Sequence, residues 1–93
     1  MPKYLIARGL PKAGSLNQAQ EHDIAVKSND VLRQMRSEGK EIQWLQSYVT
    51  TDAIHCVYIA ANPALVQEHA QRGGFPCDNV EEVAGIIDPT TGE

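Results

Sequence analysis

The sequence lacks the cysteine content and the long apolar runs that mark secreted and membrane-spanning proteins. Only two cysteines are present, Cys56 and Cys77, and they do not make the disulfide framework of a small secreted domain. The longest strongly apolar run is CVYIAA, far short of a membrane span, and the opening MPKYLIARGL has no cleavage-site pattern of a signal peptide. We therefore expect a cytosolic (cytoplasmic) protein with two free thiols.

The chain also lacks an excess of basic residues. Eight Lys and Arg stand against twelve Asp and Glu, a net charge of -4, and the charges are scattered rather than grouped. Binding to nucleic acid or to an anionic membrane is therefore disfavoured. No repeat or low-complexity segment divides the 93 residues, so we expect a single domain over residues 1–93, at a size where association often adds stability.

The stretch from Glu41 to Ala61 is rich in β-branched and aromatic residues, and a Thr-Thr-Asp cluster divides it into two runs of strand length. This pattern predicts a β-hairpin, in which Trp44 faces Ile59 across the two strands. One predicted face carries Trp44, Val57 and Ile59, and the other carries Leu45, Val49, Ile54, Cys56 and Tyr58. Because both faces are largely apolar, we expect helices on one and a second copy of the chain on the other.

Two elements are predicted before the hairpin. Residues 3–10 have the composition of a strand, with Tyr4, Ile6 and Arg8 on one side. From 18 to about 38 the apolar residues recur at three-, four- and seven-residue steps, which predicts an amphipathic helix ended by Gly39. Ser15 or Asn17 is placed to cap this helix.

Two further elements are predicted after the hairpin. Asn62-Pro63 begins a helix that runs to about Arg72, and Gly73-Gly74 ends it. Residues 80–88 (VEEVAGIID) have enough β-branched side chains for a fourth strand. The order β-α-β-β-α-β is that of the α+β ferredoxin-like sandwich, with both helices on one face of a four-stranded antiparallel sheet. The open face is the one we expect to pair with a second copy, as in a dimeric α/β barrel.

This chain direction places the start of the first helix, the end of the second and the hairpin turn at one end of the sheet. All three histidines of the chain, His22, His55 and His69, are thereby predicted at the same end as Tyr48 and Asp52. Imidazole and carboxylate are ligands for late first-row divalent metals, nickel among them. No HxH, HExxH or CxxC spacing fixes two ligands on one element, however.

Each histidine also has a simpler structural interpretation. His22 is most simply a solvated helix residue, and His55 a cross-strand partner of Tyr48. His69 lies on the inward stripe of its helix, where a hydrogen-bonded core histidine and a metal ligand are both compatible with the pattern. No Ser-His-Asp or Cys-His spacing is recognisable.

Four stretches form a specific combination: MPKYLIARGLPKAG, IQWLQSYVTTDAIHCVYIA, VQEHAQRGGFP and IIDPTT. In these stretches the chain resembles a small bacterial family that has a nickel-binding, nickel-responsive member. The resemblance implies a ferredoxin-like homodimer that binds nickel and has no established catalytic activity. It implies His69 as a candidate ligand; Tyr48, Asp52 and Cys56 lie in another matching stretch, and position 55 in that family is more usually tyrosine.

Functions of different classes remain open at this point. The first is a small cytosolic homodimer that binds a divalent metal, nickel, through His69 and neighbouring oxygen or imidazole donors. The second is an enzyme of the dimeric α/β-barrel type, a monooxygenase or isomerase, with a small organic molecule in an open-face cavity lined by His55, Tyr48 and Trp44; it rests on fold analogy. A protein-interaction module is a third.

Overall fold

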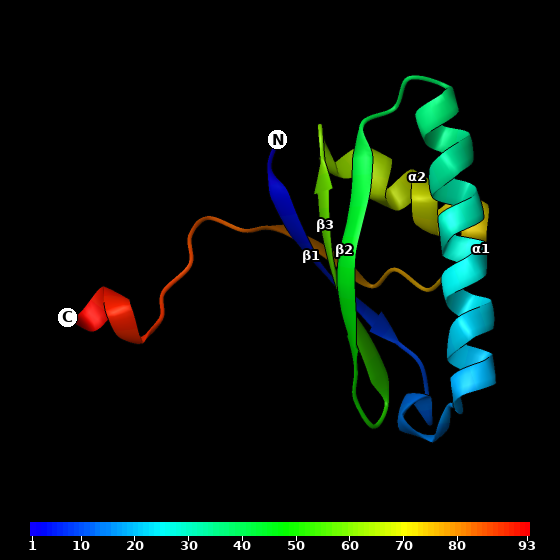
Figure 1. Ribbon diagram of the computed structural model, residues 1–93, viewed down its shortest axis with the longest axis horizontal. Coiled ribbons are helices and arrows are strands. Elements are labelled where there is room, and N and C mark those ends of the chain that lie inside the picture. The colour runs from blue at the N-terminus through cyan, green and yellow to red at the C-terminus, as the bar shows by residue number, and fades with distance from the viewer.

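A computed structural model describes all residues from 1 to 93, and its elements follow the predicted order (Figure 1). They are β1 (Lys3–Gly9), α1 (Gln18–Ser37), β2 (Ile42–Val49), β3 (Ala53–Ala60), α2 (Pro63–Gly73) and β4 (Asn79–Glu82), with short 3-10 helices at Ala13–Ser15 and Pro89–Gly92. The strands are antiparallel in the order β2-β3-β1-β4, and both α-helices cover one face of the sheet. The predicted ferredoxin-like fold is confirmed. No helix has the length and apolarity needed to cross a membrane.

Local signals explain where the helices begin and end. At the start of α1 the Asn17 side chain accepts from the Gln20 backbone N–H at 2.8 Å, and the Gln20 side chain accepts from the Asn17 N–H at 3.0 Å, which is a capping box. The Asn62 side chain caps α2 through the Leu65 N–H at 3.1 Å. Gly74 ends α2 with a φ of 70°, a left-handed conformation that favours glycine.

The hairpin contains a β-bulge that the sequence pattern did not predict. Trp44 faces Tyr58 rather than Ile59, because Leu45 is an extra residue in β2 and shifts the register there. Trp44 therefore packs against the helix-covered core, and Leu45 lies on the open face. The predicted faces of these two residues were the reverse and are wrong.

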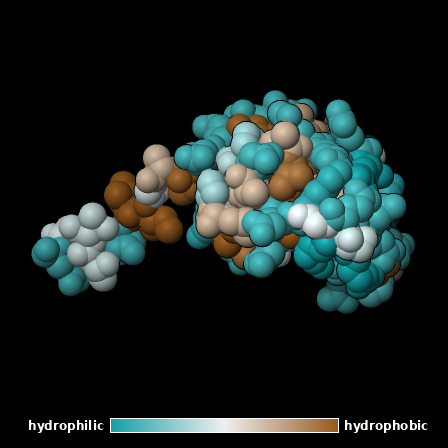
Figure 2. Space-filling model, turned by 90° about the horizontal axis from the view of Figure 1, so that it is seen from above, coloured by the Kyte–Doolittle hydropathy of each residue, from teal (hydrophilic) through white to brown (hydrophobic).

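The fourth strand is shorter than predicted. It covers only Asn79–Glu82, and the last backbone bond between this segment and β1 joins the Val83 N–H to the Lys3 carbonyl at 2.8 Å. Pairing stops because β1 begins at Lys3 and offers no further partner. The following residues leave the sheet as a tail that projects from the body, and Ile86 and Ile87 on it are 71% and 87% exposed (Figures 1 and 2).

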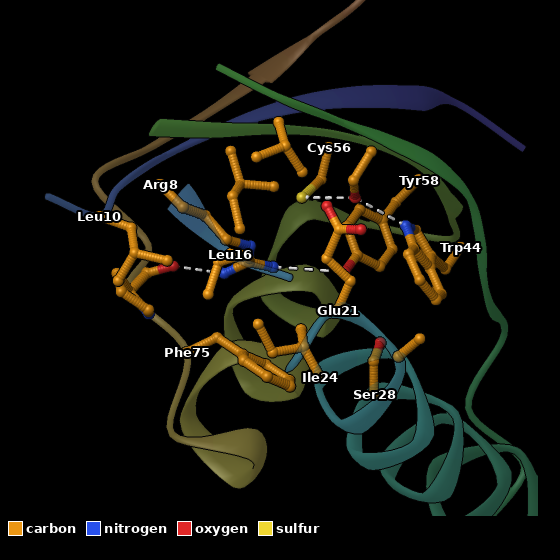
Figure 3. A pocket seen from close by; sticks show the side chains of 15 residues that line it. Arg8, Leu10, Leu16, Glu21, Ile24, Ser28, Trp44, Cys56, Tyr58 and Phe75 are labelled. Atoms are coloured by element: carbon orange, nitrogen blue, oxygen red, sulfur yellow. Dashed lines mark hydrogen bonds between the residues drawn. The ribbon is translucent and has the colours of Figure 1, made fainter. Parts of the chain in front are cut away.

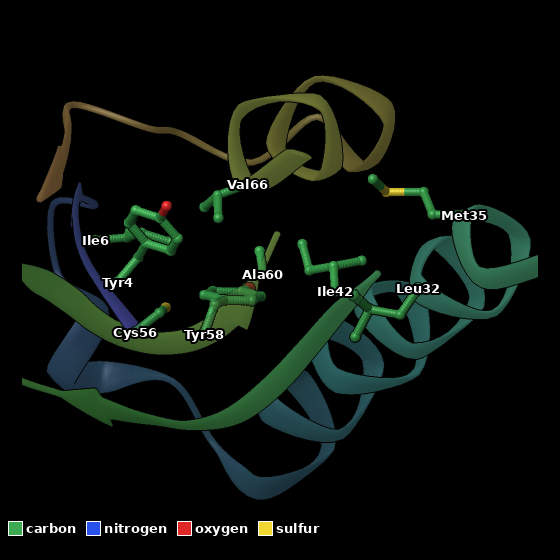
Figure 4. Packing of buried hydrophobic residues seen from close by; sticks show 9 residues of the cluster. All are labelled: Tyr4, Ile6, Leu32, Met35, Ile42, Cys56, Tyr58, Ala60 and Val66. Atoms are coloured by element: carbon green, nitrogen blue, oxygen red, sulfur yellow. The ribbon is translucent and has the colours of Figure 1, made fainter. Parts of the chain in front are cut away.

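The core fills the space between the sheet and the two helices (Figure 4). It consists of nine buried residues: Tyr4, Ile6, Leu32, Met35, Ile42, Cys56, Tyr58, Ala60 and Val66. Full burial of one large aliphatic side chain contributes roughly 1.5–3 kcal/mol, so this layer carries most of the favourable free energy of folding. The opposite face of the sheet has no such cover and leaves Leu5, Leu45 and Tyr48 exposed.

Candidate functional site

A pocket of about 480 Å³ lies between α1 and the helix-covered face of the sheet (Figure 3). Its walls come from β1, the connection between β1 and α1, the first half of α1, β2, β3 and the loop after α2. The lining residues are Arg8, Leu10, Leu16, Glu21, Ile24, Ala25, Ser28, Trp44, Ser47, Val49, Ile54, Cys56, Tyr58, Phe75 and Pro76. Its volume lies within the range of small-molecule sites, as does its mostly apolar lining with a few polar groups. Sequence reasoning had placed a possible cavity on the opposite face.

Arg8 is the one buried charged side chain of this pocket, with 5% of its surface exposed. Its guanidinium donates to the Pro76 carbonyl and, at 3.3 Å, to the Tyr58 hydroxyl. The guanidinium carbon also lies 6.0 Å and 5.6 Å from the ring centroids of Tyr58 and Phe75. None of the ion pairs in the chain includes Arg8, so no carboxylate compensates its charge.

A chain of polar side chains lines the wall formed by β2 and β3. The Trp44 indole N–H donates to the Ser47 hydroxyl at 2.9 Å, and that hydroxyl donates to the Cys56 sulfur at 2.9 Å (Figure 3). The bulge at Leu45 makes this possible, because it puts Trp44 and Ser47 on the same face of β2 although they are three residues apart.

His69 lies behind the pocket wall and is completely buried. Its Nε2 is 3.1 Å from the Ser28 hydroxyl, which lines the pocket, whereas its Nδ1 has no partner. The ring packs between Tyr58 and Phe75, with centroids 5.3 Å and 5.5 Å away. Burial, reinforced by the positive charge of Arg8, lowers the pKa of His69 to about 4, so the imidazole is neutral at pH 7.

The other candidate ligands lie elsewhere. Tyr48 and His55 pair across the hairpin, as predicted, and both are exposed on the open face. His22 is exposed on α1, and the Asp52 side chain accepts from the Lys12 backbone N–H at 3.0 Å, which ties the hairpin turn to the loop after β1.

The three histidines, which were predicted at one end of the sheet, therefore do not come together in one site. His69 is buried on α2, in the layer between the sheet and the helices, whereas His55 on β3 is exposed on the open face of the sheet. No group of three or more His, Cys, Asp or Glu side chains suited to hold a metal ion forms within one chain. The lining predicted for an open-face enzyme cavity also loses one residue, because Trp44 does not lie on the same face of the sheet as Tyr48.

Comparison with known proteins now identifies the family. The sequence pattern of the family described as "Nickel responsive protein SCO4226-like" matches residues 4–83. The chain belongs to this family. The match takes in both α-helices, β2, β3, β4 and all but the first residue of β1. It leaves out the projecting tail beyond Val83.

A solved structure of similar fold is described as "Crystal structure analysis of SCO4226 from Streptomyces coelicolor A3(2)". The two chains superpose with a TM-score of 0.72 over 91% of this chain and 99% of that one, at 17% sequence identity. At this identity the likeness supports the fold assignment alone. A search of curated proteins finds no significant match.

The family description raises the question of whether His69 fits a nickel ion. Its Nδ1 has no hydrogen-bond partner, yet aromatic rings flank the imidazole, and burial together with the nearby Arg8 cation lowers its pKa. A divalent cation would be repelled by Arg8, and His69 is not part of any group of three His, Cys, Asp or Glu side chains that could hold a metal ion. Within one chain, the surroundings of His69 do not fit nickel.

Proposed function

We propose that this protein is a small cytosolic homodimer that binds nickel. The observation that carries the proposal is the match of residues 4–83 to a family described as nickel responsive. Because one chain does not bring three candidate ligands together, the proposal requires ligands from both copies or from water. Nickel accepts such mixed nitrogen and oxygen coordination.

The uncovered sheet face supports the homodimer. A single-domain antiparallel sheet usually keeps an exposed face polar, but here Leu5 is 50% exposed, Leu45 45% and Tyr48 57%. A groove of about 490 Å³ runs between this face and the projecting tail, with Lys3 as its only charged wall residue. Two copies packed open face to open face would cover this surface, and each tail would lie along the partner.

Tyr48 and His55 support a site between the copies. They are cross-strand neighbours, both exposed on the face that the dimer would cover. We therefore assign His55 and Tyr48 as the first ligands, and the exposed Asp52 in the hairpin turn as a further donor. His22 is left out because it lies on α1, which covers the other face of the sheet. His69 is left out of the first set because it is completely buried and already bonded to Ser28.

The experiment is a calorimetric nickel titration of tag-free, chelator-treated protein, repeated with zinc, cobalt and copper, while light scattering follows the dimer mass. Saturable nickel binding at a fixed ratio to protein is expected in the wild type, and its loss is expected in His55→Ala. His69→Gln is the matched variant, because it removes the buried imidazole and should leave nickel binding unchanged. Loss in His69→Gln with normal binding in His55→Ala would refute the assigned ligands, and no saturable binding in the wild type would refute the function.

The interface has its own test. Leu45→Glu places a charge on the open face, and we expect this variant to be monomeric and to bind nickel more weakly. Val26→Glu is the control, because Val26 is equally exposed, at 43% against 45%, but lies on α1 away from the open face. Equal dimer masses for the two variants would count against the open-face dimer.

A further inference from the structure

We propose that the pocket between α1 and the sheet binds a small organic monocarboxylate with an apolar body, and that Arg8 anchors its carboxylate. This site is distinct from the nickel site proposed above, since it lies on the other face of the sheet and uses none of the same residues. The proposal rests on the geometry around Arg8 and on the character of the pocket walls.

The position of Arg8 calls for an anion. Burying a charge is costly unless the charge is paired, and Arg8 is 5% exposed with no carboxylate partner in the chain. Its contacts with Pro76 and Tyr58 use two of the five N–H groups that a guanidinium offers. The remaining donors suit a carboxylate, which arginine binds through two parallel hydrogen bonds.

These contacts also hold the guanidinium in place before a ligand arrives. The Pro76 carbonyl and the Tyr58 hydroxyl accept hydrogen bonds from it, and its carbon lies 5.6 Å from the centroid of the Phe75 ring (Figure 3). A side chain fixed in this way loses little conformational freedom on binding, which favours affinity.

The walls of the pocket define the rest of the ligand. About 480 Å³ accommodates a single aromatic ring or a branched alkyl chain, and Leu16, Ile24 and Trp44 supply apolar contacts. The charged wall residues are Arg8, which is buried, and Glu21, which is exposed on the first turn of α1. One buried cation matches one negative charge, so a monocarboxylate fits better than a doubly charged phosphate ester.

Trp44 provides a direct readout, because it is the only tryptophan of the chain and lies in the pocket wall. The probe is phenylacetate, titrated against Trp44 fluorescence in the presence of a chelator that removes nickel. Phenylacetamide is the matched neutral control, and phenyl phosphate tests the number of charges. We expect saturable binding of phenylacetate and at least tenfold weaker binding of both controls, because hydrogen bonds to a charged group are stronger than those between neutral groups.

Two variants test the anchor. Arg8→Met keeps an unbranched side chain without the charge and should weaken phenylacetate at least tenfold, provided that circular dichroism shows a folded chain. Glu21→Gln removes the one negative charge of the pocket wall, which is exposed and repels the carboxylate. We expect this variant to bind phenylacetate severalfold more tightly.

The proposal is overturned if the acid and the amide bind equally, if phenylacetate leaves Trp44 fluorescence unchanged, or if Glu21→Gln weakens binding. The acid-to-amide comparison uses the wild type, so it decides the question even if Arg8→Met does not fold. His55→Ala should bind phenylacetate as the wild type does, and this separates failure of the carboxylate site from failure of the proposed nickel site.

Discussion

Acid should destabilise this protein through His69. The imidazole is completely buried and its pKa is lowered to about 4 in the folded chain, against about 6.5 in an unfolded one. Above pH 6.5 both states hold a neutral ring and His69 adds no pH dependence. As the pH falls from 6.5 towards 4, the unfolded chain takes up the proton first, so stability is lost across that window.

The size of the loss follows from the two pKa values. Proton linkage predicts that the free energy of unfolding falls by about 2 kcal/mol at pH 5 and by about 3 kcal/mol at pH 4, relative to its value at neutral pH. A small domain has only roughly 5–15 kcal/mol of stability in total, so the change is large enough to measure.

The assay is urea unfolding followed by the fluorescence of Trp44 at several pH values between 7.5 and 5. His69→Gln is the key variant, because an amide can still bond to Ser28 but does not titrate. Between pH 7.5 and pH 5 the free energy of unfolding of this variant should fall by about 2 kcal/mol less than that of the wild type, whatever the stability of the variant at pH 7.5. His22→Gln should keep the wild-type loss because His69 is still present. Parallel curves for the wild type and His69→Gln would refute the reasoning.

Two further predictions concern the ends of the helices. Bidentate hydrogen bonds from Arg72, at 2.6 and 2.8 Å, lower the pKa of the exposed Glu38 to about 2. Glu38→Gln should lower the melting temperature slightly, and because surface ion pairs are screened, the difference should shrink in about 1 M salt; a salt-independent difference would contradict this. Gly74→Ala should cost about 1 kcal/mol in urea unfolding because Gly74 has a φ of 70°, whereas Gly85→Ala, with no atom within 4 Å of the added carbon, should cost less. Equal costs would show that the left-handed conformation is not the cause.

The helices could be predicted closely because their signals are local. Asn17 and Gln20 stand three residues apart, and the capping box that they form needs no information from the rest of the chain. The bulge could not be predicted in this way, because Trp44 and Leu45 are both apolar and the pattern does not show which of them is extra. The length of β4 also depends on another segment, since β1 begins at Lys3 and ends the pairing.

The candidate site, too, could be predicted only where its signal is local in the sequence. Alternation in the first strand already placed Arg8 beside Tyr4 and Ile6, and a charged residue on a buried face was the signal of an unusual site. Ser28 and His69 lie on different helices and 41 residues apart in the chain, so no short motif encodes the contact between them. The nickel ligands are harder still, because the proposed site depends on a second copy of the chain.

The bulge at Leu45 makes β2 unusually sensitive to its own length. The extra residue lets Ile42 and Trp44 before it, and Ser47 and Val49 after it, all contribute to the same side of the sheet. Removing a single residue here would restore simple alternation, and the side chains of one half of the strand would then exchange faces of the sheet. In relatives, insertions and deletions should therefore be confined to the turn that follows this strand. A designer who wishes to lengthen the chain should add residues in that turn, at Thr50 and Thr51, and leave the length of β2 unchanged.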